Sequence, residues 1–441
     1  MGCALGVALG VFAAAGAAGA ADAADAVDAA TAAATPSAVL PDRPSGDAPG
    51  PADSWLIRNG RWFDGNAFVA DERLVLQGRF VDVLPGPPQR TLDLHGAWVV
   101  PPYGEAHNHN LDDLALAPAL IRRYLHDGVF YLKNPTDVAE QVERVRPLIN
   151  RPDSVDAVYA HAGITATDGH PSLLYRFVAE REGNPYPGGY RDHAYVCVDN
   201  EQDLAAVWPR LLATHPDFIK IYLLYTDSFA KRRDDPAFRG LKGLDPALVA
   251  KVSERAHAAG LRVTAHVETA ADFSVAVRGG VDEIAHLPGY TFGVFNVERF
   301  VLDPAAVADA AARGVTVVTT TSIARNDPGN RLALIEANQV ANLRALHAAG
   351  VRLALGSDDY AQTSVVEAMN LLRLEAFDRR TLLNLWTRDT AMAIFPGRSL
   401  GQLQAGYEAS FLVLGGDPLV DFHETQHILL RFKQGWLLPD M

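Results

Sequence analysis

The segment Pro101-Pro102-Tyr103-Gly104-Glu105-Ala106-His107-Asn108-His109 follows a short apolar run, Ala97-Trp98-Val99-Val100, whose composition predicts a β-strand. Side chains two residues apart share one face of a strand, so His107 and His109 are expected to point the same way off the end of this strand. Two imidazoles held side by side provide half of a metal site. Because an isolated His-x-His is more often a pair of surface histidines, the rest of the chain decides between the two interpretations.

Four more polar residues stand at the ends of short apolar runs further along the chain. They are Lys220 in Phe218–Tyr222, His266 in Val263–His266, His286 in Glu283–His286 and Asp358 in Ala354–Asp358. Active sites of parallel barrels lie at the carboxyl ends of the strands. All six residues therefore fall where such a barrel would carry its site.

Strand patterns alternate with helical patterns through the middle of the chain, which favours an α/β fold, a (β/α)8 TIM-like barrel. Besides the run before His107, the predicted strands are 129–132, 155–159, 218–223, 261–266, 281–286, 315–320 and 351–355. The predicted helices are 115–126, 137–149, 202–213, 246–259, 270–278, 304–312 and 332–349.

The order His-x-His, Lys, His, His, Asp on successive strands resembles the amidohydrolase superfamily of metal-dependent hydrolases. The resemblance extends from Trp55 to Phe422, and the branch of imidazolonepropionases and metal-dependent prolidases is the most similar. Its most specific parts are His107-x-His109, Ile219-Lys220-Ile221, Gly280–His286, Gly356-Ser357-Asp358 and the closing segment Gly401–Pro418.

Two positions depart from the pattern of that family. The family usually has Pro-Gly-x-x-Asp before His-x-His, whereas this chain has Pro102-Tyr103-Gly104-Glu105. Its closing segment usually has Ala-Asp, whereas this chain has Ala409-Ser410. Neither change removes a metal ligand, and both leave room for an unusual substrate.

The resemblance implies that the two chain ends pair into a small β-sandwich beside the barrel. The residues alone show that both ends are β-rich, with hairpins predicted at Asn59-Gly60 and at Gln77-Gly78-Arg79. The expected division is a signal peptide at 1–21, a disordered linker at 22–51, the sandwich at 52–100 and 400–441, and the barrel at 101–399.

The residue types suit one or two divalent metal ions, with zinc the expected metal. A lysine ammonium has no lone pair for a metal, but its neutral amine can react with CO2 to give a carbamate whose two oxygens bridge two ions. In the resembling family this lysine is often carboxylated. The alternative for Lys220 is a plain ammonium paired with a carboxylate at the barrel mouth.

With two metals, the resemblance implies that His107, His109 and Asp358 hold one ion, and that His266 and His286 hold the other. Lys220 then bridges them. The metals would lower the pKa of a bound water from ~15.7 to ~7, and Asp358 would carry its proton to the leaving amine. With one metal, as in imidazolonepropionase, Lys220 would be structural.

Two further residues are candidates for substrate binding. His170, in Asp168-Gly169-His170-Pro171, opens a long insertion after the third predicted strand and resembles a Gly-His motif of the prolidase-like branch. Tyr222 shares a strand face with Lys220. Loop structure for His170 and core packing for Tyr222 are the alternatives.

The chain of 441 residues has a net charge of −14, which argues against nucleic acid and anionic membrane as partners. Residues 1–21 carry no charge and end in small residues, which predicts a secretory signal, with a membrane anchor or an Ala-rich tail as alternatives. The mature protein is thus expected in the periplasm or outside the cell. Whether it forms a homo-oligomer stays open.

The predicted function is a secreted metal-dependent hydrolase that cleaves C–N bonds in a small-molecule substrate, either an amide, a cyclic amide or a dipeptide. The alternatives are a mononuclear hydrolase like imidazolonepropionase and a binding protein on a barrel that has lost turnover.

Overall fold

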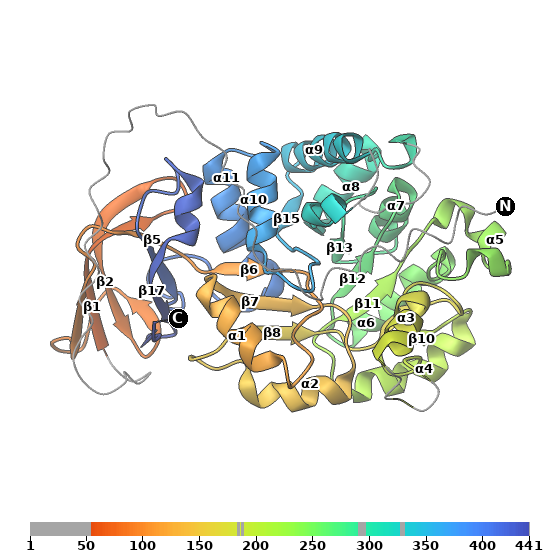
Figure 1. Cartoon of the computed structure of the whole chain (residues 1–441), viewed down its shortest axis with the longest axis horizontal. Helices are drawn as coiled ribbons and strands as arrows, with labels where there is room; N and C mark the ends of the chain where they lie inside the picture. Colours follow the sequence, from red (N-terminus) through yellow and green to blue (C-terminus); the bar gives the residue numbers. More distant parts are fainter. Residues whose placement is uncertain (1–53, 183–185, 187–188, 290–296, 327–330, 441) are drawn as a thin grey trace.

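A computed structural model of the chain describes residues 54–182, 186, 189–289, 297–326 and 331–440. Figure 1 shows a sheet built from both ends of the chain at one end of the molecule and a barrel built from the middle of the chain beside it. The predicted signal peptide at 1–21 and linker at 22–51 lie outside the described residues.

The sheet of the chain ends has eight strands in the order β18-β17-β16-β5-β1-β2-β3, with β4 paired to β1. β5 pairs with β1 on one side and with β16 on the other, so it joins the two ends of the chain. Trp55, Trp62 and Phe411 pack in its core. The bounds are β1 Ser54–Phe63, β2 Phe68–Leu76, β3 Arg79–Val81, β4 Arg90–Asp93, β5 Trp98–Val100, β16 Phe411–Leu414, β17 Ile428–Lys433 and β18 Trp436–Leu437.

The hairpin predicted at Asn59-Gly60 is wrong. β1 continues through both residues, with a register shift between Ile57 and Gly60, and the turn to β2 follows at Asp64. Asn59 has a φ of 57°, so the residues that predicted a turn form a bulge instead. The hairpin predicted at Gln77-Gly78 is confirmed, and it joins β2 to β3.

The barrel strands lie in two parallel sheets, β6-β7-β8 and β10-β9-β11-β12-β13-β14-β15. The two sheets adjoin at two places, which we call seams. At the first seam the chain passes directly from β8 to β9. At the second, between β6 and β15, the N–H of Ala106 donates to the C=O of Leu355 at 2.8 Å. The bounds are β6 Tyr103–Glu105, β7 Val129–Asn134, β8 Asp156–Tyr159, β9 Gly163–Thr165, β10 Tyr195–Cys197, β11 Ile219–Tyr222, β12 Val263–His266, β13 Glu283–Ala285, β14 Thr316–Val318 and β15 Arg352–Ala354.

The first barrel strand is β6, not the run Ala97–Val100 that was predicted to lead into His107. Most of that run forms β5 in the sheet of the chain ends. Pro101 and Pro102 follow it, and proline has no N–H to continue a ladder. The chain therefore leaves one sheet at the two prolines and enters the other at Tyr103.

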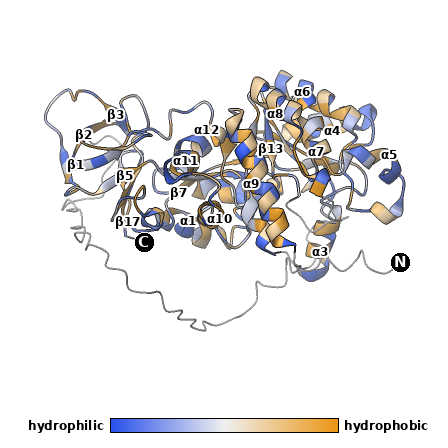
Figure 2. Ribbon diagram, turned by 90° about the horizontal axis from the view of Figure 1, so that it is seen from above, coloured by the Kyte–Doolittle hydropathy of each residue, from blue (hydrophilic) through white to orange (hydrophobic). Residues whose placement is uncertain are grey.

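Helices surround the barrel, and each predicted helix corresponds to an observed one. Figure 2 shows hydrophobic and hydrophilic stretches on the same helices, as expected when one face packs on strands. In the part of the chain that the structure describes, no helix has the length and apolarity needed to cross a membrane. The bounds are α1 Ala117–His126, α2 Ala139–Val145, α3 Ser172–Glu182, α4 Glu201–Ala213, α5 Phe229–Arg232, α6 Val249–Ala258, α7 Ala270–Arg278, α8 Pro304–Arg313, α9 Leu332–Ala348, α10 Val365–Arg373, α11 Arg379–Asn384 and α12 Thr390–Ile394.

A buried ionic network connects the sheet of the chain ends to the barrel. Lys433 on β17 lies 2.7 Å from Asp156 on β8, and the two side chains are 0% and 2% exposed. Arg398 contacts Asp156 at 2.8 Å and Glu408 at 2.6 Å. Each charge has an opposite partner, so removal of one partner would leave a buried charge uncompensated.

We therefore expect Asp156→Ala to lower the free energy of unfolding by about 3–5 kcal/mol, because Lys433 would stay buried without its partner. Adding Lys433→Met should recover part of this loss, since it removes the unpaired cation. Urea unfolding measures both. The control is Asp309→Ala, which breaks the exposed pair of Asp309 with Arg313 and should change the free energy of unfolding by less than about 1 kcal/mol. Equal losses in the two single variants would contradict the role of the network.

Candidate functional site

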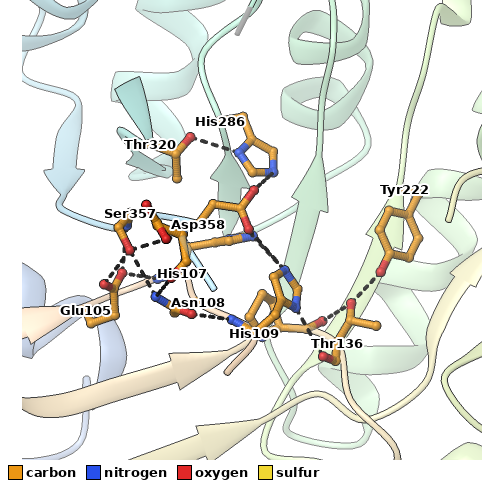
Figure 3. A network of polar contacts seen from close by, with 12 residues as sticks. Glu105, His107, Asn108, His109, Thr136, Tyr222, His286, Thr320, Ser357 and Asp358 are labelled. Atoms are coloured by element: carbon orange, nitrogen blue, oxygen red, sulfur yellow. Dashed lines mark hydrogen bonds and ion pairs between the residues drawn. The ribbon is translucent and has the colours of Figure 1, made fainter. Parts of the chain in front are cut away.

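The structure places the predicted metal-binding residues at one rim of the barrel, at the carboxyl ends of its strands. Figure 3 shows several of them pointing toward one another from different strands. Their positions are His107 and His109 after β6, Lys220 within β11, His266 at the end of β12, His286 after β13 and Asp358 after β15.

The tightest group in the described part of the chain is His107, His109 and Asp358, whose ligand atoms lie within 4.8 Å of one another. The Nε2 atoms of His107 and His109 are 3.2 Å apart, and they lie 3.7 and 3.5 Å from Oδ1 of Asp358. Atoms that bind one tetrahedral zinc at ~2.0–2.1 Å are roughly 3.4 Å apart. The spacing of the three side chains therefore fits a divalent ion.

The other two histidines lie against this group. Nε2 of His286 is 3.9 Å from Oδ2 of Asp358, and its ring centroid is 4.6 Å from that of His107, so His286 contacts both the carboxylate and the His107–His109 pair. The ring centroids of His286 and His266 are 4.7 Å apart. The four imidazoles form a continuous cluster, and the carboxyl of Asp358 lies within it.

Backbone and hydroxyl groups orient two of the imidazoles. Nδ1 of His109 lies 3.1 Å from the C=O of Thr136, which can only accept, so Nδ1 carries the hydrogen and Nε2 keeps its lone pair. Nδ1 of His286 pairs with the hydroxyl of Thr320 at 2.8 Å. In both residues, Nε2 is left to face the centre of the cluster. Such partners of the second ring nitrogen are a regular feature of metal-binding histidines.

The electrostatics of the site favour neutral imidazoles. Burial lowers the pKa of His107, His266 and His286 well below the ordinary value, and the nearby Lys220 ammonium lowers each further. Burial also lowers the pKa of His109 to about 3. Burial raises the pKa of Asp358, and the Lys220 ammonium opposes that rise. A cluster of unprotonated imidazoles beside a carboxyl offers the lone pairs that a divalent metal requires.

Lys220 is 1% exposed and lies close enough to the four histidines for its charge to lower the pKa of each. Among the described residues, no carboxylate oxygen comes within 4.0 Å of its Nζ, which lies 5.3 Å from the ring centroid of Tyr222. Burial lowers the pKa of Lys220. A second buried lysine differs in this respect, because Lys133 on β7 lies 2.7 Å from Glu283.

Tyr222 and His170, the predicted substrate-binding residues, lie beside His266. The ring centroid of His170 is 4.8 Å from that of His266 and 5.2 Å from that of Tyr222. The hydroxyl of Thr136 donates to the C=O of Pro135 at 2.6 Å, so its oxygen accepts from the hydroxyl of Tyr222, with which it is also in contact. Tyr222 therefore contacts the loop that orients His109.

Sequence reasoning missed several polar residues of the site. Thr136 and Thr320 follow β7 and β14, so the strand-end rule that selected the histidines could have indicated them as well. Tyr360, whose ring stacks on His109 at 5.7 Å, lies in a loop with no periodic signal. Glu268 follows β12, and its carboxyl lies 3.4 Å from Nε2 of His266, while Thr269 caps α7.

Comparisons with known proteins agree with this architecture. Residues 236–436 match the sequence model of the Amidohydrolase family. No curated protein shows significant sequence similarity to the chain.

Solved structures with the same fold cover most of the chain. An ochratoxinase from A. niger is 18% identical, with a TM-score of 0.67 over 88% of this chain and 95% of the other. A prolidase complexed with N-methylphosphonate-L-proline is 20% identical, with a TM-score of 0.65 over 88% of this chain and 100% of the other. A molinate hydrolase is 15% identical, with a TM-score of 0.63 over 88% and 95% of the two chains. Identities this low show the shared fold, a TIM-like barrel with an additional β domain. The chain is thus similar to the Amidohydrolase family over residues 236–436 and shares the fold of these solved structures over most of its length.

Proposed function

We propose that the chain is a metal-dependent hydrolase that cleaves a C–N bond in an amide, a cyclic amide or a dipeptide. One observation carries the proposal: four imidazoles, a carboxyl and a buried lysine from five strand ends meet at one rim of the barrel. Proteins of this fold that are named prolidase, Xaa-Pro dipeptidase and phenylurea hydrolase support the reaction class. The residues that hold the ions are those already predicted, and zinc remains the expected metal.

A divalent ion, when bound, supplies Lewis acidity to the scissile carbonyl and makes a water acidic enough to attack at neutral pH. Asp358 carries the proton from the water to the leaving nitrogen. Its carboxylate takes a proton from the attacking water as the C–O bond forms, and returns it to the nitrogen as the C–N bond breaks. The products are a carboxylic acid and an amine, which then exchange a proton to become a carboxylate and an ammonium. Asp358 is suited to this role because one of its oxygens lies 3.5 Å from His109 and the other 3.9 Å from His286, so the carboxyl lies within the imidazole cluster.

Lys220 supports a two-metal site over a one-metal site. An ammonium that is 1% exposed and has no carboxylate oxygen within 4.0 Å among the described residues is costly, which favours the neutral amine. The neutral amine attacks CO2 to form a carbamate and releases one proton. The carbamate would place a bridging anion next to all four imidazoles. The alternative of an ion-paired lysine at the mouth of the barrel has less support, because no carboxylate oxygen of the described residues lies within 4.0 Å of Nζ of Lys220; the charge of Asp358 acts on it only from a longer distance.

The ring faces of His170 and Tyr222 line the side of the cluster at His266, where a substrate would enter. We propose that these faces contact the substrate, while the hydroxyl of Tyr222 steadies the loop around Thr136. Secretion, expected from residues 1–21, and the domain limits set from sequence are part of the proposal. The acidic chain is proposed to act on small molecules and not on nucleic acid.

The deciding experiment measures bound metal together with turnover on a panel of dipeptides and cyclic amides. We expect the protein to contain zinc or a similar ion and to hydrolyse at least one class. Asp358→Asn should keep most of the metal and lose turnover, because an amide cannot carry the proton. The control is Asp359→Asn, which changes the adjacent carboxyl group. Asp359 is not among the proposed metal ligands. Metal without turnover on any member of the panel would favour a binding protein, and an unchanged kcat in Asp358→Asn would reject the assigned part.

The second test concerns Lys220. If it is carboxylated, Lys220→Ala should lose metal and turnover together, and acetate or propionate should partly restore both by occupying the place of the carbamate. Lys133→Met is the matched control, since it removes a buried lysine that already has a carboxylate partner. Added acids should not change its metal content. One tightly held ion and similar kcat in Lys220→Ala and the unmutated protein would establish the mononuclear alternative instead.

A further inference from the structure

We propose that Glu105 is a positioning residue that fastens the first barrel strand to the last and thereby sets the distance between the His107–His109 pair and Asp358. The inference rests on the proposed metal site and assigns to Glu105 the control of its affinity. Glu105 is 0% exposed and touches none of the reacting groups, so its effect must pass through the backbone.

The seam between the first and last strands is the place where the site depends on few backbone contacts. β6 pairs with β7 and β15 pairs with β14, but the two strands share no ladder. Beyond the strand ends, the N–H of Ala106 donates to the C=O of Leu355 and the N–H of Asp358 donates to the C=O of His107, both at 2.8 Å. The second of these bonds ties a histidine ligand directly to the carboxyl ligand.

The carboxylate of Glu105 adds a side-chain connection across this seam (Figure 3). Oε1 accepts from the N–H of Ser357 at 2.7 Å, and Oε2 accepts from its hydroxyl at 2.8 Å. Oε1 also lies 3.4 Å from the N–H of His107. Glu105 therefore holds both residues that adjoin the seam, one on each side.

The hydroxyl of Ser357 has its other bonding positions filled, which fixes its direction. Its oxygen accepts from Nδ2 of Asn108 at 3.0 Å and from the N–H of Asp359 at 3.3 Å. The remaining proton can then only go to Glu105. Oδ1 of Asn108 accepts from the N–H of His109 at 2.7 Å, so the same network reaches the second histidine.

The backbone on the far side of the seam needs such support. Asp358 has a φ of 52°, in the left-handed region that residues with a side chain rarely adopt. The preceding Gly356 packs so closely on His107 that a Cβ there would lie 2.7 Å from its backbone nitrogen. Bonds to the N–H groups of Ser357, Asp358 and Asp359 hold this conformation, and Glu105 provides the first of them.

Length and hydrogen-bonding capacity of the side chain both matter to this role. An aspartate would be one methylene shorter and would withdraw the carboxylate from Ser357 by about 1.5 Å, the length of a C–C bond. A glutamine would keep the reach but would turn an NH2 group toward a donor or leave one acceptor fewer. Neither substitution should reproduce the contacts of Glu105.

The test compares Glu105→Gln, Glu105→Asp and Ser357→Ala with the unmutated protein. Chelator competition gives the dissociation constant for Zn2+ and Co2+, and the absorption spectrum of the Co2+ form reports ligand geometry. We expect each variant to lose on the order of 10- to 100-fold in affinity, with an altered Co2+ spectrum. The double variant Glu105→Gln/Ser357→Ala should be little weaker than either single variant, because the same contact is removed.

The matched control is Asp282→Asn. Asp282 also joins two neighbouring strands, accepting from the N–H of Val263 at 2.7 Å, but at the opposite rim of the barrel. It should lower the Tm of the metal-free protein and leave both dissociation constants unchanged. If the Glu105 variants fail to fold, Ser357→Ala keeps the carboxylate and carries the test alone.

If the unmutated protein binds metal and the variants show the same affinity and the same Co2+ spectrum, the role of Glu105 is overturned and the proposed function stands. A lower Tm without a change in affinity would overturn it equally, since it would show a structural contribution only. An unmutated protein that binds neither ion would refute the proposed function and this inference together.

Discussion

The common direction of the barrel strands is the constraint on which the site depends. In a parallel barrel every strand ends at the same rim, so one polar residue per strand end is enough to gather a cluster. The cost is that polar groups leave water. Here the imidazoles are kept neutral by burial, and Thr136 and Thr320 bond the Nδ1 atoms of His109 and His286. The rim therefore holds neutral imidazole nitrogens whose lone pairs are already oriented for a metal ion.

Buried charged residues have close ion-pair partners at one rim of the barrel, whereas Lys220 at the other rim has none within 4.0 Å among the described residues. At the rim nearest the sheet of the chain ends, Asp156, Lys433 and Arg398 neutralise one another in close pairs. Inside the barrel, Lys133 and Glu283 do the same. Lys220 is the contrast, because the described residues give it no carboxylate partner. Lys133 and Lys433 are ion-paired and Lys242 donates to the C=O of Arg233, whereas Lys220 has neither kind of contact among the described residues, which is the physical reason for assigning it chemistry.

The strand ends of the site could be predicted from the sequence because a buried strand leaves a short apolar run. Lys220, His266 and His286 each interrupt or end such a run, and their register follows from that alone. The loops could not be predicted in the same way. His286, Thr320 and Asp358 have positive φ values of 77°, 43° and 52°, which no hydrophobic period signals. The contacts that depend on these loops, including those of Tyr360, appear only in the folded chain.

The switch of sheets at Pro101 and Pro102 also constrains how the chain is made. β5 precedes the whole barrel in sequence, yet one of its edges pairs with β16, which follows the barrel. During synthesis at about 5–20 residues per second, that edge stays open for tens of seconds while the intervening chain leaves the ribosome. An open strand edge is a template for pairing with other chains. The nascent protein therefore passes through an aggregation-prone stage whose length is set by the barrel itself, and it ends only when the last strands arrive.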